Sequence, residues 1–334
     1  MKFPDAFARL ERGPLTAEEV RASFTQILAG EWTPVQIGAF AAAMRLRGED
    51  AEAIGAAADA LRSVMSGVDH GLDVVADTCG TGGDGAHTIN VSTAAAIVLA
   101  SCGVHVAKHG NRSVSSRCGS ADIVAALGIP LELDASRHVA VLRAAHITFL
   151  MAPAHHPALR HASSARRELG VRTIFNALGP LINPARATHQ LIGVYEDRLR
   201  PIMASALGRR GTKRAWIVRS EDGLDEISPA APTNVTVLDE GVISERIVTP
   251  EDFGVERVSL DALAGGDAAT NASIVERLLR GEPHDAANAV IINAAAALHV
   301  TRSTPLRDAA KEIRDALSSG RAFATLEKWR EAVR

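Results

Sequence analysis

The sequence predicts an α/β protein with a small helical domain and a larger α/β domain that holds a mostly parallel sheet. Residues 1–68 show only helical spacing of their apolar side chains. From Leu72 onward, short apolar runs alternate with helical segments, which is typical of a parallel sheet covered by helices. A glycine-rich loop also joins the first of these runs to the helix that follows it. We therefore assign a helical domain to residues 1–68 and an α/β domain to residues 72–334.

Two helix starts stand out in the helical domain. Thr16 and Glu19 have the spacing of a capping box, and apolar residues recur at helical intervals from Val20. Thr33 and Gln36 repeat this spacing, with a proline at the first helical position between them. The pattern of residues 160–185 fits either domain, and we expect its helices to join the helical domain.

The elements of the α/β domain are delimited by glycine, proline and changes of period. Strands are predicted at 74–76, 104–106, 147–150 and 216–218. Helices are predicted at 91–101, 123–127 and 289–300, and again after Pro305. Two further runs, 234–238 and 242–248, flank Glu240 and Gly241 and predict a β-hairpin.

Composition excludes several classes of protein. Charged residues are 22% of the 334 and the net charge is −3, so we expect no nucleic-acid partner. No apolar run is long enough to span a bilayer, and the acidic, interrupted N-terminus does not resemble a secretion signal, so we expect no membrane partner. The three cysteines, Cys79, Cys102 and Cys118, lack metal-binding spacing and cannot all pair with one another. A cytoplasmic protein fits these features.

The glycine-rich loop is the clearest candidate for a ligand site. Gly80, Gly82, Gly83 and Gly85 lie between a predicted strand and a helix, where the backbone can approach a ligand closely. The N–H groups at the helix start attract an anion, and the nearby Asn and Ser/Thr side chains add neutral donors. One or two glycines would fit a simple tight turn, but four with these polar residues favour phosphate binding.

The surrounding residues favour a phosphorylated sugar over a nucleotide. Gly80, Gly82 and Gly85 match the dinucleotide fingerprint, but the expected acid after the second strand is replaced by Lys108 and its basic neighbours. The Walker lysine is absent. Asp84 would repel a pyrophosphate unless a metal ion lay between them. The loop therefore indicates a phosphorylated sugar bound with a metal.

A basic, serine-rich segment covers residues 108–120 and follows the second predicted strand. Lys108, Arg112 and Arg117 supply charge, and four serines supply hydroxyl groups. A solvated surface loop is the alternative. Because the segment follows a neighbouring strand of the sheet, we expect it to lie at the same edge as the glycine-rich loop.

Five segments together resemble the anthranilate phosphoribosyltransferases: residues 77–93, 108–116, 119–122, 172–181 and 223–226. They stand in that family's order and near its spacings, so the resemblance covers essentially the whole chain. The glycine-rich loop alone would be a weak match. Ile89 and Ile182 depart from the family's usual phenylalanine and threonine, but neither position supplies ligand-binding chemistry.

The resemblance implies a fold of the nucleoside phosphorylase/phosphoribosyltransferase type, a homodimer formed through the helical domain, and a cleft between the domains. It implies transfer of the 5-phosphoribosyl group of phosphoribosyl pyrophosphate to anthranilate, with two magnesium ions in each monomer, in tryptophan biosynthesis. The α/β domain would then bind phosphoribosyl pyrophosphate through these residues: Gly80, Gly83, Asp84, Thr88, Asn90, Val91, Ser92, Thr93, Lys108, His109, Gly110, Asn111, Arg112, Ser113, Val114, Ser115, Ser116 and Ser120.

The resemblance also assigns the metal and acceptor sites. Ser92, Asp225 and Glu226 would serve magnesium, which prefers oxygen ligands. Without the resemblance, Asp225 and Glu226 would be interpreted as an exposed acidic turn, and we expect that turn to be exposed. Gly80, Asn111 and Arg166 would contact anthranilate. The sequence around Arg166 alone indicates a solvated helix face, whereas a planar guanidinium matches a benzoate carboxylate; Arg167 is the alternative if the register differs by one.

No residue is assigned as a general base, because an aromatic amine is already a nucleophile. Two other functions stay open. A pyrimidine nucleoside phosphorylase would share the architecture but use free phosphate, without an evident need for two magnesium ions. A non-catalytic nucleic-acid-binding relative should have a more basic surface than a sequence pI of about 6.5 indicates.

Overall fold

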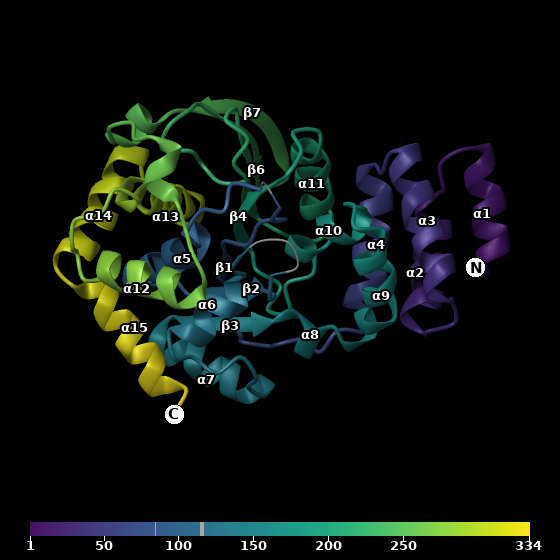
Figure 1. The fold of residues 1–334 in the computed structure, drawn as a ribbon, viewed down its shortest axis with the longest axis horizontal. Helices are drawn as coiled ribbons and strands as arrows, with labels where there is room; N and C mark the ends of the chain where they lie inside the picture. Colours follow the sequence, from purple (N-terminus) through teal and green to yellow (C-terminus); the bar gives the residue numbers. More distant parts are fainter. Residues whose placement is uncertain (84, 114–116) are drawn as a thin grey trace.

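The computed structural model describes residues 1–83, 85–113 and 117–334. A group of helices that includes the N-terminus lies at one end, and a sheet with its covering helices forms the larger part (Figure 1). The predicted fold class, a small helical domain beside a larger α/β domain with a mostly parallel sheet, is confirmed. No helix in the described ranges combines the length and apolar character that a membrane crossing needs.

Four helices make up the N-terminal part: α1 (Phe3–Arg12), α2 (Ala17–Leu28), α3 (Pro34–Arg47) and α4 (Ala51–Arg62). Both predicted capping boxes are present. The Thr16 N–H donates to Glu19 Oε2 over 2.8 Å, and the Thr33 N–H donates to Gln36 Oε1 over 2.9 Å. These bonds satisfy N–H groups that would otherwise lack partners at the helix starts.

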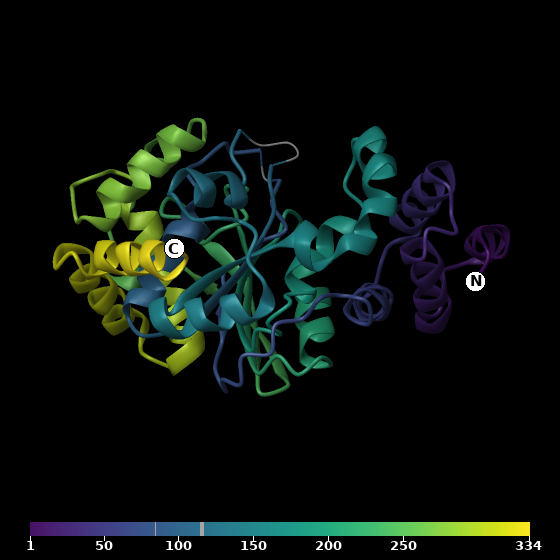
Figure 2. The same cartoon turned by 90° about the horizontal axis from the view of Figure 1, so that it is seen from below.

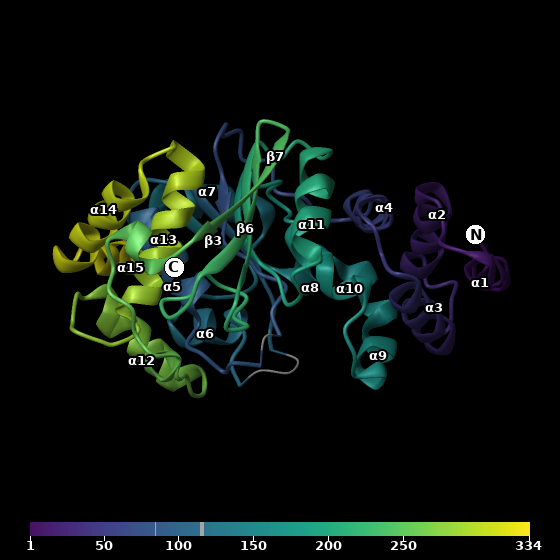
Figure 3. The same ribbon diagram turned by 90° about the horizontal axis from the view of Figure 1, so that it is seen from above.

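The segment that sequence pattern could not place contains α9 (Arg160–Leu169) and α10 (Ile174–Ala177), which follow the short α8 (Ala152–His155). Helix α9 lies beside α3 (Figures 1 and 3). Phe175 of α10 packs against Phe24 of α2, with ring centroids 5.3 Å apart, in an apolar cluster that also holds α3 and α4. This packing supports our assignment of the segment to the helical domain, whose exact bounds stay a prediction.

The strands of the described chain form one sheet in the order β3-β2-β1-β4-β5-β6-β7. Neighbours from β3 to β5 are parallel, and the β5–β6 and β6–β7 pairs are antiparallel. The strands are β1 (Ala76–Asp77), β2 (Val106–Gly110), β3 (Ile147–Met151), β4 (His189–Gly193), β5 (Arg214–Ser220), β6 (Thr233–Asp239) and β7 (Val242–Val248).

Among the predicted strands only that at 242–248 has the predicted bounds; the others start or end at different residues, and one strand was not predicted. Strand β1 begins at Ala76, two residues after the predicted start, and β2 continues through Lys108 to Gly110 instead of ending at Val106. Strand β4 was missed. The predicted hairpin is confirmed: Glu240 and Gly241 both have positive φ, 45° and 86°, as a type I′ turn requires.

Helices cover both faces of the sheet, and the sheet separates two apolar clusters. In β5, Trp216 and Val218 belong to the cluster under the C-terminal helices, whereas Ile217 belongs to the cluster shared with the N-terminal helices. The C-terminal and N-terminal helices therefore lie at opposite ends of the molecule (Figure 2). The remaining helices are α5 (Val91–Ser101), α6 (Ser120–Ala126), α7 (Ala135–Ala145), α11 (Leu199–Gly208), α12 (Ala268–Leu279), α13 (Ala287–Arg302), α14 (Leu306–Ser318) and α15 (Arg321–Ala332).

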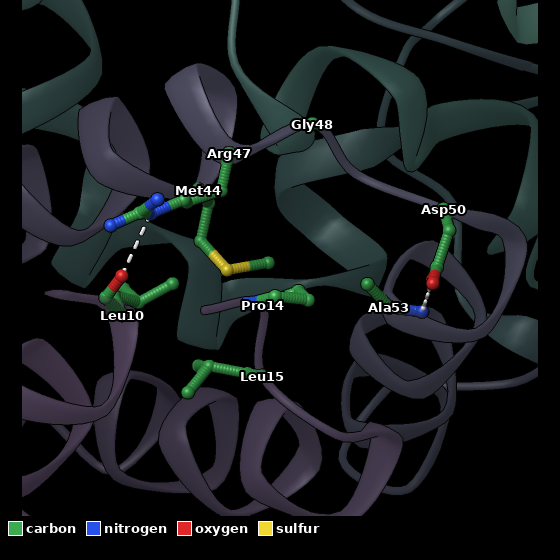
Figure 4. Close-up of a pocket in the computed structure, with 8 residues that line it drawn as sticks. All are labelled: Leu10, Pro14, Leu15, Met44, Arg47, Gly48, Asp50 and Ala53. Atoms are coloured by element: carbon green, nitrogen blue, oxygen red, sulfur yellow. Dashed lines mark hydrogen bonds between the residues drawn. The ribbon is translucent and has the colours of Figure 1, made fainter. Parts of the chain in front are cut away.

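A small cavity lies within the helical part, between α1, α3 and the start of α4 (Figure 4). Leu10, Leu15 and Met44 line it, and the Arg47 guanidinium at its rim donates to the Leu10 carbonyl over 2.8 Å. Its volume of about 10 Å³ is close to the minimum for a single water molecule. This cavity is therefore too small for a substrate.

Candidate active site

The glycine-rich loop begins at the point where the strand order reverses. Strand β1 pairs with β2 on one side and with β4 on the other, and open α/β sheets bind ligands at the carboxyl ends of such strands. The Thr81 N–H donates to the carbonyl of Gly193, the last residue of β4, over 2.9 Å, and the Tyr195 N–H donates to Thr81 Oγ1 over 3.0 Å. The loop is thus fixed across the ends of both strands.

The acidic turn reaches the same place because glycines leave room for it. A Cβ atom on Gly193 would overlap the Asp225 carbonyl, and one on Gly80 would lie 3.5 Å from Asp225 Oδ2. The structure therefore brings Asp225 against the glycine-rich loop, although the two are far apart in sequence. Our expectation that the turn is exposed was wrong: Asp225 and Glu226 are both half-buried, since the turn packs against β4.

Ser92, Lys108 and Glu226 converge at the start of α5. The Ser92 N–H donates to Glu226 Oε1 over 3.2 Å, so this carboxylate lies at the positive end of the helix. Lys108 Nζ donates to the Thr78 carbonyl over 3.2 Å and to Ser92 Oγ over 3.4 Å. Two sequence-predicted metal ligands and the predicted phosphate-binding lysine are therefore neighbours.

Lys108 differs from expectation in one respect. We expected it in a basic loop, but it lies inside β2 and is 1% exposed. A buried ammonium needs a compensating charge, and Asp77 at the end of β1 provides it. Burial raises the pKa of the Asp77 carboxyl group, and the nearby charge of Lys108 opposes this shift. Asn183 Nδ2 also donates to Asp77 Oδ2 over 2.7 Å. Neither Asp77 nor Asn183 was predicted from the sequence to be a site residue.

The oxygen donors at this point fit a magnesium ion. Ser92, Asp225 and Glu226 offer one hydroxyl and two carboxylates, which are oxygen ligands as magnesium prefers. Among residues 1–83, 85–113 and 117–334, no cluster of three or more His, Cys, Asp or Glu side chains is arranged around a possible metal. Magnesium binds through one or two carboxylates and keeps water or substrate oxygens as its other ligands.

The second loop is organised by Asp122 of α6. Asp122 accepts hydrogen bonds from the Ser113 N–H over 3.1 Å and from Arg112 Nη1 over 3.0 Å. Ser120 Oγ donates to the Asn111 carbonyl over 3.4 Å. Asn111 and Arg112 are exposed, so their side chains are accessible to a ligand. Four predicted site residues lie outside the described residues: Asp84, Val114, Ser115 and Ser116.

Arg166 lies on α9, apart from the two loops. Its guanidinium is 5.7 Å from the centroid of the Phe175 ring, and burial lowers its pKa from the ordinary value. In the part of the chain that the structure describes, no hydrogen bond or ion pair reaches this guanidinium. Arg167 is exposed, whereas Arg166 is half-buried. A half-buried cation without a carboxylate partner suits an anionic ligand better than its exposed neighbour does.

Comparison with known proteins gives matches over nearly the whole chain. Residues 8–65 match the helical bundle domain of a glycosyl transferase family, and residues 72–323 match that family's a/b domain. The anthranilate phosphoribosyltransferase of Myxococcus xanthus is 48% identical over 313 residues, which is 93% of each chain. That of Methylocella silvestris is 46% identical over 95% of this chain and 91% of its own.

The chain belongs to the anthranilate phosphoribosyltransferase family.

Solved structures of the family agree with this assignment. The crystal structure of the Thermus thermophilus enzyme is 39% identical, covers 98% of this chain and 99% of its own, and superposes with a TM-score of 0.92. The Saccharomyces cerevisiae enzyme in complex with phosphoribosyl pyrophosphate and magnesium is 28% identical over 96% of this chain and 93% of its own, with a TM-score of 0.89.

Several of the predicted donor-site residues are buried or half-buried. Val91 and Thr93 are 2% and 1% exposed. Asn90 and Thr88 are half-buried. Gly110 ends β2, and His109 beside it is buried, with Nδ1 3.0 Å from the Gly179 carbonyl. Burial lowers the His109 pKa to about 3, so this ring is neutral near pH 7.

Arg172 is a candidate site residue that the sequence analysis quoted only as part of a family segment. A Cβ atom on Gly83 would lie 2.7 Å from Arg172 Nη2, so the guanidinium packs against the backbone of the glycine-rich loop. Its other face lies over the Tyr195 ring, 4.5 Å from the centroid. Local sequence gives no signal that pairs Arg172 with Gly83, because their contact depends on how α9 and α10 pack beside the sheet.

Proposed function

We propose that this chain transfers the 5-phosphoribosyl group of phosphoribosyl pyrophosphate to the amino nitrogen of anthranilate. The products are N-(5-phosphoribosyl)anthranilate and pyrophosphate, in tryptophan biosynthesis, as the chain's family membership indicates. One observation of geometry carries the proposal. A glycine-rich loop, a buried lysine and an acidic turn meet at the start of α5, at the reversal point of the sheet.

The donor would bind at this convergence. Lys108 and the N-terminus of α5 supply positive potential for phosphate oxygens. Glycines of the loop permit close approach of the backbone, and the accessible Arg112 and Asn111 line the neighbouring loop. The negative phosphates of the donor would face positively charged groups of the loops everywhere except at the acidic turn, Asp225 and Glu226.

Magnesium ions would remove the repulsion between the acidic turn and the pyrophosphate of the donor. The yeast relative has been solved in complex with phosphoribosyl pyrophosphate and magnesium. We propose that this chain uses two magnesium ions per monomer. Ser92, Asp225 and Glu226 would hold them, with water and donor oxygens as further ligands. Bound magnesium would supply the positive charge that neutralises the pyrophosphate leaving group.

Arg166 would hold the carboxylate of anthranilate, with Gly80 and Asn111 as further contacts. The yeast relative has been crystallised with 4-fluoroanthranilate, a ring of the same class. Because positive charge develops on the ribose carbon as pyrophosphate leaves, positioning of the amine and stabilisation of the leaving group should dominate the rate. The neutral His109 ring can accept a hydrogen bond, but the reaction needs no strong base.

The relatives favour this function over the two alternatives. They match this chain over nearly its full length and are anthranilate phosphoribosyltransferases. A pyrimidine nucleoside phosphorylase would use free phosphate, and a nucleic-acid-binding relative would use neither anthranilate nor phosphoribosyl pyrophosphate. The test is an assay of protein, magnesium, anthranilate and phosphoribosyl pyrophosphate, followed by the loss of anthranilate fluorescence. Chelation should abolish turnover. Turnover with ribose 1-phosphate as the donor, or full activity without metal, would contradict the proposal.

We also infer a cytoplasmic homodimer formed through the helical domain. Val35 and Leu46 of α3 are 81% and 88% exposed, and large apolar side chains this exposed are typical of interaction surfaces when they lie on one element. No disulfide joins the cysteines in the described part of the chain, which suits a reducing compartment.

A further inference from the structure

Asn271, on the first turn of α12, contacts the predicted donor site through another asparagine. Its Nδ2 donates to Asn90 Oδ1 over 3.0 Å, although the two residues are 181 positions apart. Asn271 is 1% exposed, so it cannot itself reach a ligand in the cleft. Any effect it has on substrate must therefore pass through its neighbours, of which Asn90 is the predicted donor contact.

Asn90 occupies the N-cap position of α5, but its side chain does not cap the helix. Its Nδ2 instead donates to the Cys118 carbonyl over 3.2 Å, while its Oδ1 accepts from Asn271. The amide is therefore held in one orientation from both ends. One of its two N–H groups is used on Cys118, which leaves the second for a ligand oxygen.

The orientation of the Asn271 amide is also fixed. Its Oδ1 accepts from the Gly266 N–H over 2.7 Å, and a backbone N–H can only donate. The Asn271 nitrogen must then face Asn90. The Asn271 carboxamide therefore connects the Asn90 side chain to the Gly266 backbone, just before α12, through two hydrogen bonds.

That same segment covers the exit of the glycine-rich loop. The Ile89 N–H donates to the Leu263 carbonyl over 2.8 Å, and the Gly265 N–H donates to the His87 carbonyl over 3.0 Å. A Cβ atom on Gly265 would lie 2.7 Å from the Thr88 carbonyl carbon, so only glycine permits this approach. Residues 263–266 and Asn271 thus hold residues 87–90 from one side.

We propose that Asn271 is a positioning residue for the phosphoribosyl donor, which acts by fixing the Asn90 amide at the exit of the glycine-rich loop. This inference rests on the proposed function, because it takes Asn90 as a donor contact. Replacement of Asn271 by alanine removes the N–H that fixes Asn90 Oδ1. Replacement by aspartate sets a carboxylate oxygen against Asn90 Oδ1, and turning the Asn90 amide would then set its oxygen against the Cys118 carbonyl.

The test is a double-mutant cycle measured by steady-state kinetics and by calorimetric titration with phosphoribosyl pyrophosphate and magnesium. We expect Asn271→Ala to raise the KM and Kd of the donor about tenfold, with the KM of anthranilate changed much less. In an Asn90→Ala background the same substitution should change the donor KM by less than about twofold, because the group through which it acts is gone. Asn271→Asp should weaken donor binding further than alanine does.

Controls separate positioning from stability. Asn288 of α13 also donates to a backbone carbonyl, that of Glu256 over 2.9 Å, but lies outside the proposed site, so Asn288→Ala should leave both KM values unchanged. If Asn271→Ala does not fold, Asn271→Ser keeps a small polar group for the same cycle. Equal losses in both backgrounds, equal effects on both substrates, or wild-type kinetics would overturn the inference. A wild-type protein that fails to turn over the two substrates would instead contradict the proposed function.

Discussion

Replacement of Arg166 by alanine tests the acceptor side of the proposed site. The guanidinium is half-buried on α9, burial lowers its pKa, and in the described ranges of the chain no acid is paired with it. Among the described residues, it interacts with the face of the Phe175 ring. The substitution therefore removes a cation available for a ligand without breaking an internal ion pair.

The magnitude follows from these contacts. A charge-assisted hydrogen-bonded pair with a carboxylate contributes about 1.5–3 kcal/mol, so the apparent affinity for anthranilate should fall about 10- to 150-fold. The affinity for the donor should stay near its wild-type value, because the donor loops lie at the sheet edge and not on α9. The cation–π contact contributes about 0.5–1 kcal/mol to folding, and removal of a half-buried charge without a carboxylate partner offsets this loss. Thermal stability should therefore change little.

The measurement is a pair of saturation curves, one for each substrate, for wild type and three variants. Arg167→Ala is the matched control, since Arg167 is the exposed neighbour on the same helix. Arg166→Lys should restore binding only in part, because lysine lacks the planar pair of donors. If only Arg167→Ala lowers the affinity for anthranilate, then Arg167 and not Arg166 binds its carboxylate. Wild-type affinity in both alanine variants would refute the reasoning.

Three further outcomes are expected. Asp225→Asn with Glu226→Gln should collapse turnover and raise the magnesium concentration needed for half-maximal activity; unchanged metal dependence would leave the acidic turn without a role. Leu46→Glu should shift the protein from dimer to monomer in analytical ultracentrifugation, and an unchanged mass would place the interface elsewhere. Acid should destabilise the fold, because burial lowers the pKa of several histidines, which are protonated near pH 6.5 only when unfolded. Their contribution to stability is full only above about pH 6.5 and falls by at most about 1.4 kcal/mol per histidine per pH unit, down to folded pKa values of about 4 or, for one ring, about 3. Urea midpoints should therefore fall progressively from about pH 6.5 to about pH 4, and midpoints that stay constant would contradict this expectation. The histidines are His109, His138, His156 and His189.

Local signals in the sequence predicted the elements whose causes are local. The capping boxes at Thr16 and Thr33 and the Glu240-Gly241 turn each involve residues within a few positions of one another, and all three are present. The glycine-rich loop was likewise identified from its composition, and it lies where a parallel sheet binds ligands. Helix α5 was predicted because its apolar run is longer than a typical strand and is followed by Gly103.

Strand β4 was missed because it does not have the composition of a buried strand. Two of its five residues are His189 and Gln190, which are polar yet buried. His189 Nδ1 lies 2.9 Å from Thr188 Oγ1, and Gln190 Nε2 donates to the Pro180 carbonyl over 2.9 Å. Burial of polar groups is tolerated once each has a partner, and the Pro180 partner belongs to another segment. Hydrophobic pattern alone could not place this strand.

The site itself combines both kinds of information. Residue chemistry in the sequence identified Ser92 and the Asp225-Glu226 pair as oxygen donors, but the contact between Ser92 and Glu226 spans 134 positions and depends on the sheet. The junction with the helical part is similar: Arg45 of α3 pairs with Glu196 after β4 over 2.9 Å, and Arg198 pairs with the buried Glu49 over 3.2 Å. Because a buried carboxylate is costly without its partner, the Arg198–Glu49 pair helps to fix the position of α3, against which α9, the helix that carries Arg166, packs. The distance between acceptor and donor groups is therefore set by long-range packing, which no local pattern encodes.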